Sequence, residues 1–131
     1  MNFFSRLIAI LLSLIAFFTG GNYNNIEFYV SSEVTTESET IEIEINNYSG
    51  KKIVFDKYFT LEKIDGDVVE EIPCIGAVND IAISINNTGT YTETLKIVEL
   101  FGSTLDSGDY RLSKNLNNGY VISVDFTVFE A

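Results

Sequence analysis

Acidic side chains are the first candidates for chemistry in this sequence. Glu70 and Glu71 are adjacent, and Asp106 and Asp109 bracket a Ser-Gly pair. A glycosidase requires two carboxyl groups about 5 to 9.5 Å apart in a cleft, one as acid and the other as base or nucleophile. Because neighbouring residues of a strand point to opposite faces, the sequence predicts that these carboxylates are solvated surface groups and not a catalytic pair.

The aspartates could also form a metal site. Asp65 with Asp67, or Asp106 with Asp109, could supply the hard oxygen ligands that Ca²⁺ prefers. Neither pair has the D-x-D-x-D-G spacing with a distal glutamate that defines a dedicated calcium loop. We therefore expect no metal and no other cofactor, with weak calcium binding as the open alternative.

Nucleophilic catalysis has equally little support. Cys74 is the sole cysteine and the chain has no histidine, so the chain can form neither an internal disulfide nor a Cys-His pair. The neighbours Ile72, Pro73 and Ile75 are apolar, which predicts a buried and inert thiol. These observations predict that the protein is not an enzyme.

The charge of the chain excludes some classes of partner. There are 19 Asp and Glu against 8 Lys and Arg, a net charge of -11. Phosphate binding requires a basic face, so nucleic acid is excluded as a partner, and anionic membrane surfaces are disfavoured for the same reason. Arg111 and Lys114 lie among acidic residues, and we expect them to form exposed ion pairs of small energetic value.

Two triplets, residues 47–49 (NYS) and 86–88 (NNT), match the N-glycosylation pattern. This pattern is short and frequent, and Asn, Ser and Thr also favour tight turns. We therefore expect both triplets to form turns.

Residues 1–21 differ from the rest of the chain. Arg6 precedes an apolar run from Leu7 to Phe18, and small residues follow at Thr19 and Gly21. The run is shorter than the roughly 20 residues of a bilayer-spanning helix, so it predicts a hydrophobic signal helix that is cleaved near Gly21, with an uncleaved N-terminal anchor as the alternative. Residues 22–131 would then form one extracytoplasmic domain, secreted or associated with the cell envelope.

From residue 25 onward, apolar and polar side chains alternate with a period of two, which indicates half-buried strands. Ile41, Ile43 and Ile45 share one face of the segment TIEIEI, and the last segment alternates in the same way from Tyr120 to Phe129. Turn-rich segments separate the predicted strands about every ten residues, which favours a sandwich or barrel of seven or eight strands.

A hairpin is predicted where Asp65-Gly66 separates two strand-like runs, Tyr58 to Ile64 and Val68 to Ile72. Asp-Gly suits a type I′ turn, in which both central residues need a positive φ. A short helical turn is expected around Leu100 to Leu105.

Alternate residues of each predicted strand share one face, and the apolar face identifies the residues of the core. One face of each strand is expected to pack inward, giving a domain that is stable without disulfides or metals. The predicted core residues are Ile26, Phe28, Ile41, Ile43, Ile45, Phe59, Leu61, Leu95, Ile97, Tyr110, Leu112, Ile122, Val124 and Phe126.

The segment LDSGDYRLSK, residues 105–114, places Gly108 two residues before Tyr110 at the entry to a strand. This resembles the tyrosine corner of immunoglobulin-type sandwiches, in which the ring packs inward and the hydroxyl bonds to the backbone just upstream. Together with TIEIEINNYSGKKIVF, YFTLEKIDGDVVEEIP, NNTGTYTETLKIVELFG and YVISVDFTVFE, it makes residues 25–130 resemble bacterial immunoglobulin-like domains of exported proteins. The resemblance implies an all-β, immunoglobulin-like antiparallel β-sandwich with a structural corner at Leu105, Gly108 and Tyr110, and no catalytic residues.

The resemblance further implies a non-enzymatic module with a structural or protein-interaction role. Its expected partner is an unknown protein or another component of the cell envelope, and it would contact a membrane only through residues 1–21 if these are not cleaved. An inhibitor or accessory subunit of a secreted enzyme is one alternative, and Gly76 to Thr90 is its longest candidate loop. A carbohydrate-binding module is the other, and it would need an aromatic platform, with the candidates Tyr23, Tyr29, Tyr48, Tyr91 and Phe129.

Overall fold

Residues 25–78 and 81–131 are described by a computed structural model of the chain. The predicted signal helix and Tyr23 lie outside these residues. Within them, no helix is both long enough and apolar enough to cross a bilayer.

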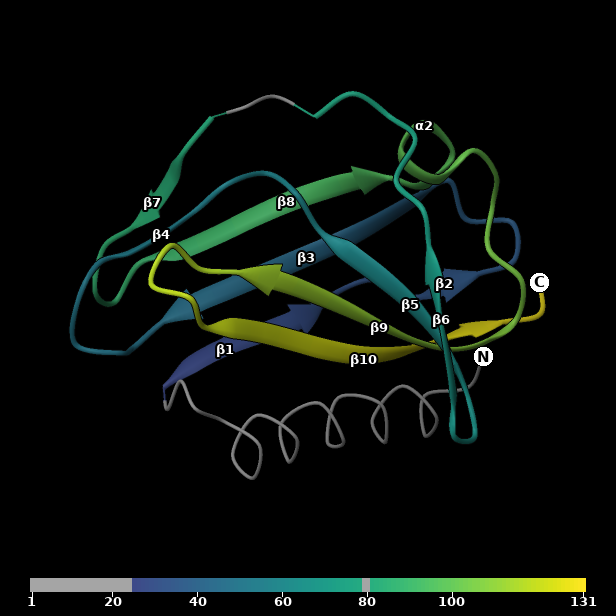
Figure 1. The fold of residues 1–131 in the computed structure, drawn as a ribbon, viewed down its shortest axis with the longest axis horizontal. Coiled ribbons are helices and arrows are strands. Elements are labelled where there is room, and N and C mark those ends of the chain that lie inside the picture. Colours follow the sequence, from purple (N-terminus) through teal and green to yellow (C-terminus); the bar gives the residue numbers. More distant parts are fainter. Residues whose placement is uncertain (1–24, 79–80) are drawn as a thin grey trace.

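The described chain is all-β apart from one short helix (Figure 1). The larger sheet has the strand order β2-β10-β9-β5-β6, a second sheet has the order β1-β3-β8, and a third pairs β4 with β7. The strands are β1 (Ile26–Val30), β2 (Val34–Thr35), β3 (Thr40–Asn47), β4 (Ile53–Phe55), β5 (Thr60–Asp65), β6 (Val68–Ile72), β7 (Ile83–Ile85), β8 (Thr90–Lys96), β9 (Gly108–Asn115) and β10 (Val121–Phe129), and the helix is α2 (Ile97–Phe101).

The prediction of seven or eight strands was too low, since the described residues contain ten. The strands that raise the number are short, because β2, β4 and β7 have only two or three residues each. A strand of that length cannot display a period of two. The sandwich is also not wholly antiparallel, because β2 runs parallel to β10, with Val34 opposite Val128.

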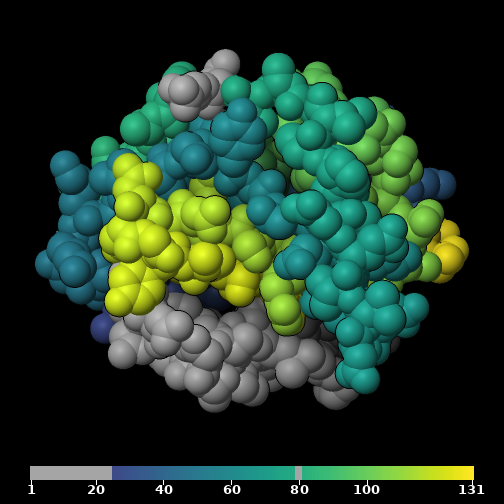
Figure 2. Space-filling view, viewed as in Figure 1, coloured from purple at the N-terminus to yellow at the C-terminus, as the bar shows by residue number. Residues whose placement is uncertain are grey.

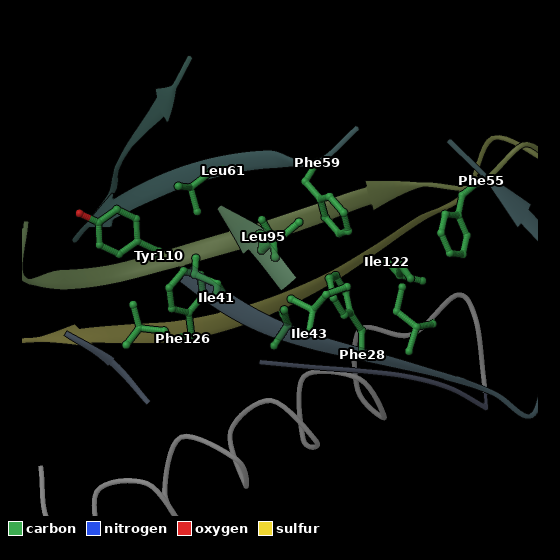
Figure 3. Packing of buried hydrophobic residues seen from close by; sticks show 14 of the residues in the cluster. Phe28, Ile41, Ile43, Phe55, Phe59, Leu61, Leu95, Tyr110, Ile122 and Phe126 are labelled. Carbon is green, nitrogen blue, oxygen red and sulfur yellow. The ribbon is translucent and has the colours of Figure 1, made fainter. Parts of the chain in front are cut away.

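Side chains from the two larger sheets meet in a single hydrophobic core (Figure 3). Ile41, Ile43 and Ile45 point into it, as their alternation predicts, and every other predicted core residue is buried as well. The structure adds Val34, Ile53, Phe55, Ile85, Phe101, Leu105, Leu116 and Val128 to the core. Most of these additions lie in the short strands or in the segments between strands, where no alternation marks them.

The predicted hairpin is present, but its turn is centred one residue later than expected. Asp65 pairs with Val68, so Gly66 and Asp67 are the two central residues. Only Gly66 of these two has a positive φ, at 60°. That pattern is typical of type II′, in which the first central residue is the one that needs a positive φ.

The helix begins earlier than the predicted turn at Leu100 to Leu105. Ile97 and Phe101 are both buried, because residues four apart lie on the same face of a helix. Gly102 ends the helix in the left-handed region, with φ at 89°, and its backbone N–H donates to the carbonyl of Val98. A helix of little more than one turn is too short to show a 3.6-residue period.

Candidate binding surface

The segment that enters β9 forms a corner of defined geometry. The Tyr110 ring is buried, packs against Phe126 with centroids 5.7 Å apart, and its hydroxyl donates to the Asp106 carbonyl over 2.7 Å. Leu105 is buried beside it, and Gly108 has a φ of 145°, which a residue with a side chain rarely adopts. This geometry resembles that of a tyrosine corner. Burial, with a smaller effect of Asp106, raises the pKa of Tyr110.

We predict that Tyr110→Phe lowers the free energy of unfolding by about 1 kcal/mol, because a partly buried hydrogen bond to the Asp106 carbonyl is lost while the ring packing is kept. Urea denaturation measures the change. Tyr58→Phe is the matched control, since Tyr58 is exposed, and it should change stability by less than about 0.5 kcal/mol. Equal effects of the two substitutions would show that the hydroxyl of Tyr110 has no structural role.

The carboxylates considered for catalysis lie on exposed strands and turns. Glu70 and Glu71 are consecutive residues of β6 that point to opposite faces, and Glu70 lies opposite Lys63 on β5. Asp109 accepts a hydrogen bond from the Thr127 hydroxyl at 2.8 Å, and Asp106 is exposed. These positions give the carboxylates no shared cleft.

The aspartates considered for calcium do not converge on a cation. Asp65 and Asp67 are exposed at the β5–β6 turn. Within residues 25–78 and 81–131, no group of three or more His, Cys, Asp or Glu side chains is arranged to hold a metal ion.

Arg111 forms the half-exposed ion pair that the sequence predicts. Its Nε and Nη2 donate to the two carboxylate oxygens of Asp125 over 2.8 and 3.2 Å, across neighbouring strands β9 and β10. The hydrogen bond to Asp125 is the largest cause of the raised pKa of Arg111. The pair is part of the outer face of the five-stranded sheet.

Lys114 was predicted to be exposed, and this prediction is wrong. Its side chain is fully buried, with Nζ donating to the Tyr58 carbonyl and lying 3.5 Å from Asp56 Oδ1. Nζ also lies over the rings of Phe59 and Phe55, at 4.1 and 5.1 Å from their centroids. Burial lowers the pKa of Lys114 to about 8, although Asp56 opposes the shift.

The signal for a buried Lys114 was present in the sequence. Tyr110 and Leu112 are predicted core residues of the same strand, and a period of two places Lys114 on their face. The prediction of exposure was based on the usual behaviour of lysine and not on the inward-facing position of Lys114 in its strand. Aromatic rings and a carbonyl acceptor let the long side chain of Lys114 remain on the core face of the strand.

A pH dependence follows from the lowered pKa of Lys114. Between pH 8, near its folded pKa, and pH 10.5, its ordinary pKa, the unfolded chain holds a proton that the folded chain has lost. The free energy of unfolding therefore gains a contribution that rises with pH in this window. The Lys114→Met variant lacks this contribution. The free energy of unfolding of the wild type, measured relative to that of the variant, should therefore increase with pH.

The measurement is urea denaturation of both proteins at several pH values from about 8 to about 10. Near pH 10.0 the buried Tyr110 begins to contribute in the opposite direction, because its pKa is raised and the unfolded tyrosine ionises first. Tyr110 is present in both proteins, so its effect cancels in the comparison. A stability difference that does not change with pH would contradict the assignment.

Asn47, in the first glycosylation-like triplet, is completely buried. Its Nδ2 donates to the carbonyls of Lys51, Ile85 and Asn86 over 2.8, 3.0 and 3.2 Å, and its Oδ1 accepts from the backbone N–H of Ser49 over 3.1 Å. A buried nitrogen with three acceptors cannot be a glycan attachment point in the folded domain. Asn47 instead connects the end of β3 to the turn between β7 and β8.

The second triplet also forms a turn. The Asn86 carbonyl accepts from the Gly89 backbone N–H over 2.9 Å, and Thr88 has a φ of 69°. The Asn87 Oδ1 accepts from the Gly50 backbone N–H over 2.9 Å, which joins this turn to the one after β3.

Cys74 was predicted to be buried, and the structure contradicts this. The thiol is exposed, and Ile75 beside it is 70% exposed. Apolar neighbours do not bury Cys74 because the segment that follows β6 runs over the surface toward α2, where the Ile75 backbone N–H donates to the Leu100 carbonyl.

The four described aromatic candidates for carbohydrate binding lie on different elements, although Tyr48 is near enough to Tyr29 to interact with it electrostatically. Tyr29 is on β1, and its hydroxyl donates to Glu27. Tyr91 packs edge-on against Phe55, and Tyr48 and Phe129 lie in the turn after β3 and at the end of β10. The four candidates in the described part of the chain therefore do not share one surface, which weakens the carbohydrate hypothesis.

The loop expected for an inhibitor is not one protruding loop. Within Gly76 to Thr90, strand β7 pairs with β4, and the turn before β8 is bonded to Asn47 and Gly50. The inhibitor hypothesis therefore has no candidate reactive loop in the described part of this segment.

The strongest candidate surface is β6, the outermost strand of the five-stranded sheet. Val68 and Val69 are 65% and 49% exposed, and Glu70 and Glu71 are exposed after them. Figure 2 shows the segment that contains β6 as a teal ridge at the molecular surface. The sequence predicts a strand with these bounds, from Val68 to Ile72, but not its place at the edge, because the position of a strand within its sheet follows from tertiary pairing.

Two facing sheets with Tyr110 at the start of β9 define an immunoglobulin-like sandwich. Residues 22–127 match the family described as bacterial Ig-like domain. The chain therefore belongs to this family of bacterial immunoglobulin-like domains.

Solved structures include folds similar to this chain. A putative lipoprotein from Bacillus anthracis has a TM-score of 0.50 and 14% sequence identity, with 82% of this chain and 75% of that chain covered. The archaellum periplasmic stator protein FlaG from Sulfolobus acidocaldarius has a TM-score of 0.49 and 14% identity, with 77% and 99% covered. Comparison with curated proteins gives no match.

Proposed function

We propose that this bacterial immunoglobulin-like domain is exported and acts, without catalysis, by binding a protein of the cell envelope. The observation that carries the proposal is the edge strand β6, which exposes Val68 and Val69. Within the described residues, β5 is the only strand that pairs with β6. Exposed apolar residues with acidic neighbours are typical of a surface that is covered by a partner.

The side chains with altered ionisation support a binding module over an enzyme. Lys114 is held by a carbonyl and two rings inside the fold, and the Tyr110 hydroxyl is bonded to the backbone. Arg111 donates through Nε and Nη2 to the two carboxylate oxygens of Asp125. Each of these groups stabilises the framework of the fold.

Export is supported by the leader-like sequence of residues 1–21. Removing it also removes Arg6, which leaves seven Lys and Arg against 19 Asp and Glu in residues 22–131. A strongly acidic surface keeps an exported domain soluble and disfavours contact with anionic lipid.

Fractionation of a bacterium that produces the tagged chain tests the proposal. We expect the protein in the envelope or the medium, with an N-terminus near residue 22 by mass spectrometry, and an adduct with another protein after chemical crosslinking of intact cells. Recovery of the chain from the cytosol with Met1 intact and no adduct would overturn the proposal.

A further inference from the structure

Strand β6 has one edge that no described strand covers. Asp65 and Val68 flank the two-residue turn and so form the first hydrogen-bonded pair of the hairpin, from which bonded and non-bonded pairs alternate. The backbone N–H and C=O groups of Val69 and Glu71 therefore point away from β5. Such an edge can accept an added strand through main-chain hydrogen bonds.

The side chains of Val69 and Glu71 lie on the outer face of the sheet. Ile72 faces inward, because it is paired with the buried Leu61 and paired residues point to the same face of a sheet. Val69 and Glu71 alternate with Ile72 and thus point outward. An added strand would meet an apolar and an acidic side chain on this face.

Charge on the outer face is unbalanced at the β6 edge. Asp125, Arg111, Glu62 and Glu71 are successive cross-strand neighbours on β10, β9, β5 and β6. Arg111 is already bonded to both oxygens of Asp125. Arg111 also interacts electrostatically with Glu62, but on its other side Glu62 faces Glu71 as a like charge, which destabilises a sheet. A cationic side chain beside Glu71 would extend the row and offset this repulsion.

The charge of the β5–β6 hairpin also disfavours a second copy of this chain as the strand that is added to the β6 edge. The segment Thr60 to Ile72 contains five Asp and Glu against one Lys. Pairing of β6 with β6 of a second copy would bring the same glutamates together, so like-charge repulsion disfavours a dimer through this edge.

We propose that the free edge of β6 binds, by strand addition, an extended segment of another protein that carries Lys or Arg at alternate positions. The main-chain groups of Val69 and Glu71 supply the pairing, and Glu62 and Glu71 recognise the cationic side chains. This inference rests on the proposed function and assigns its surface and the chemistry of its partner.

The test uses a short peptide of alternating lysine and valine as the probe, with a glutamate-valine peptide as the matched control. The probe should perturb the amide NMR signals of β6 in the isotope-labelled protein and slow hydrogen exchange of the Val69 and Glu71 amides. The control peptide should cause neither change. Signals that shift elsewhere while β6 is unaffected would overturn the proposal.

Three variants separate strand addition from general charge attraction. Val69→Pro keeps every charge but removes an outward N–H, so it should abolish binding without loss of an internal hydrogen bond. Glu71→Lys should weaken binding by about tenfold or more, whereas Glu37→Lys, the same change at an exposed site between β2 and β3, should weaken it by less than about twofold. Equal effects of the two lysine variants would overturn the proposal, as would a dimer that Val69→Pro abolishes.

The outcomes also separate this inference from the proposed function. An exported protein that forms envelope adducts but does not bind the lysine-valine peptide overturns the β6 assignment alone. A chain retained in the cytosol without adducts overturns the proposed function.

Discussion

Asn47→Ala is expected to lower the free energy of unfolding by about 3 kcal/mol. The substitution leaves the carbonyls of Lys51, Ile85 and Asn86 without their shared donor and creates a small cavity at a completely buried site. The Lys51 and Asn86 carbonyls keep hydrogen bonds from the Ser49 hydroxyl and the Gly89 N–H, so the largest loss is at the buried Ile85 carbonyl and in the cavity itself. Urea denaturation of the purified protein measures the loss.

Asn87→Ala is the matched control for this prediction. Asn87 belongs to the same pair of turns, but it is exposed and accepts one hydrogen bond, from the Gly50 N–H. Loss of this hydrogen bond should lower the free energy of unfolding by less than about 1 kcal/mol, because water can accept from the Gly50 N–H in place of Asn87. If Asn87→Ala proved as destabilising as Asn47→Ala, the buried amide would not be the principal connection between the turns.

The second large effect is expected at the centre of the core. Ile43→Ala should lower the free energy of unfolding by about 2 to 5 kcal/mol, through lost burial and the cavity that remains. Ile43 is 1% exposed and lies on β3, the middle strand of its sheet, where neighbouring strands prevent collapse into the space. The shift of the urea midpoint at an unchanged slope measures the effect.

Ile75→Ala makes the same chemical change at a site that is 70% exposed. It should alter stability by no more than about 0.5 kcal/mol. A small effect at Ile43, comparable to that at Ile75, would mean that the predicted inward face of β3 is not the core.

Alternation of side chains was the most informative signal in the sequence. It located β3 and β10, and every core residue that it selected is buried in the structure. It also pointed to two of the three buried polar residues in the described part of the chain, because Asn47 continues the series of Ile41, Ile43 and Ile45, and Lys114 continues the inward face of β9. Residue type concealed them, since amides and lysines are usually exposed.

Other features could not be predicted from local pattern. β4 and β7 are too short to alternate, and they are stabilised by pairing with each other across a long separation in sequence. The exposure of Cys74 depends on where the segment after β6 runs, and the free edge of β6 depends on the order of strands in the sheet. These are consequences of tertiary arrangement, and a window of neighbouring residues does not contain them.

The candidate binding surface also combines a feature that is visible in the sequence with one that depends on tertiary arrangement. The acidic character of the β5–β6 hairpin is visible in the sequence, and it first suggested only solvated carboxylates. Cross-strand register adds that Glu62 and Glu71 are direct neighbours and that Arg111 is already paired with Asp125. Function on this fold is therefore proposed from a sheet edge and its charge, with the tyrosine corner at Tyr110 as part of the supporting framework.

Site-specific photo-crosslinking in the living bacterium can show whether the β6 edge is where an envelope protein binds. The crosslinking residue is placed either at Val69 on the β6 edge or at Val121 on β10, since both valines are about half exposed. We expect an adduct with an envelope protein from position 69, its loss when Glu71→Lys is added, and no such adduct from position 121. Equal adducts from both positions, or none from position 69 in the exported protein, would contradict this expectation.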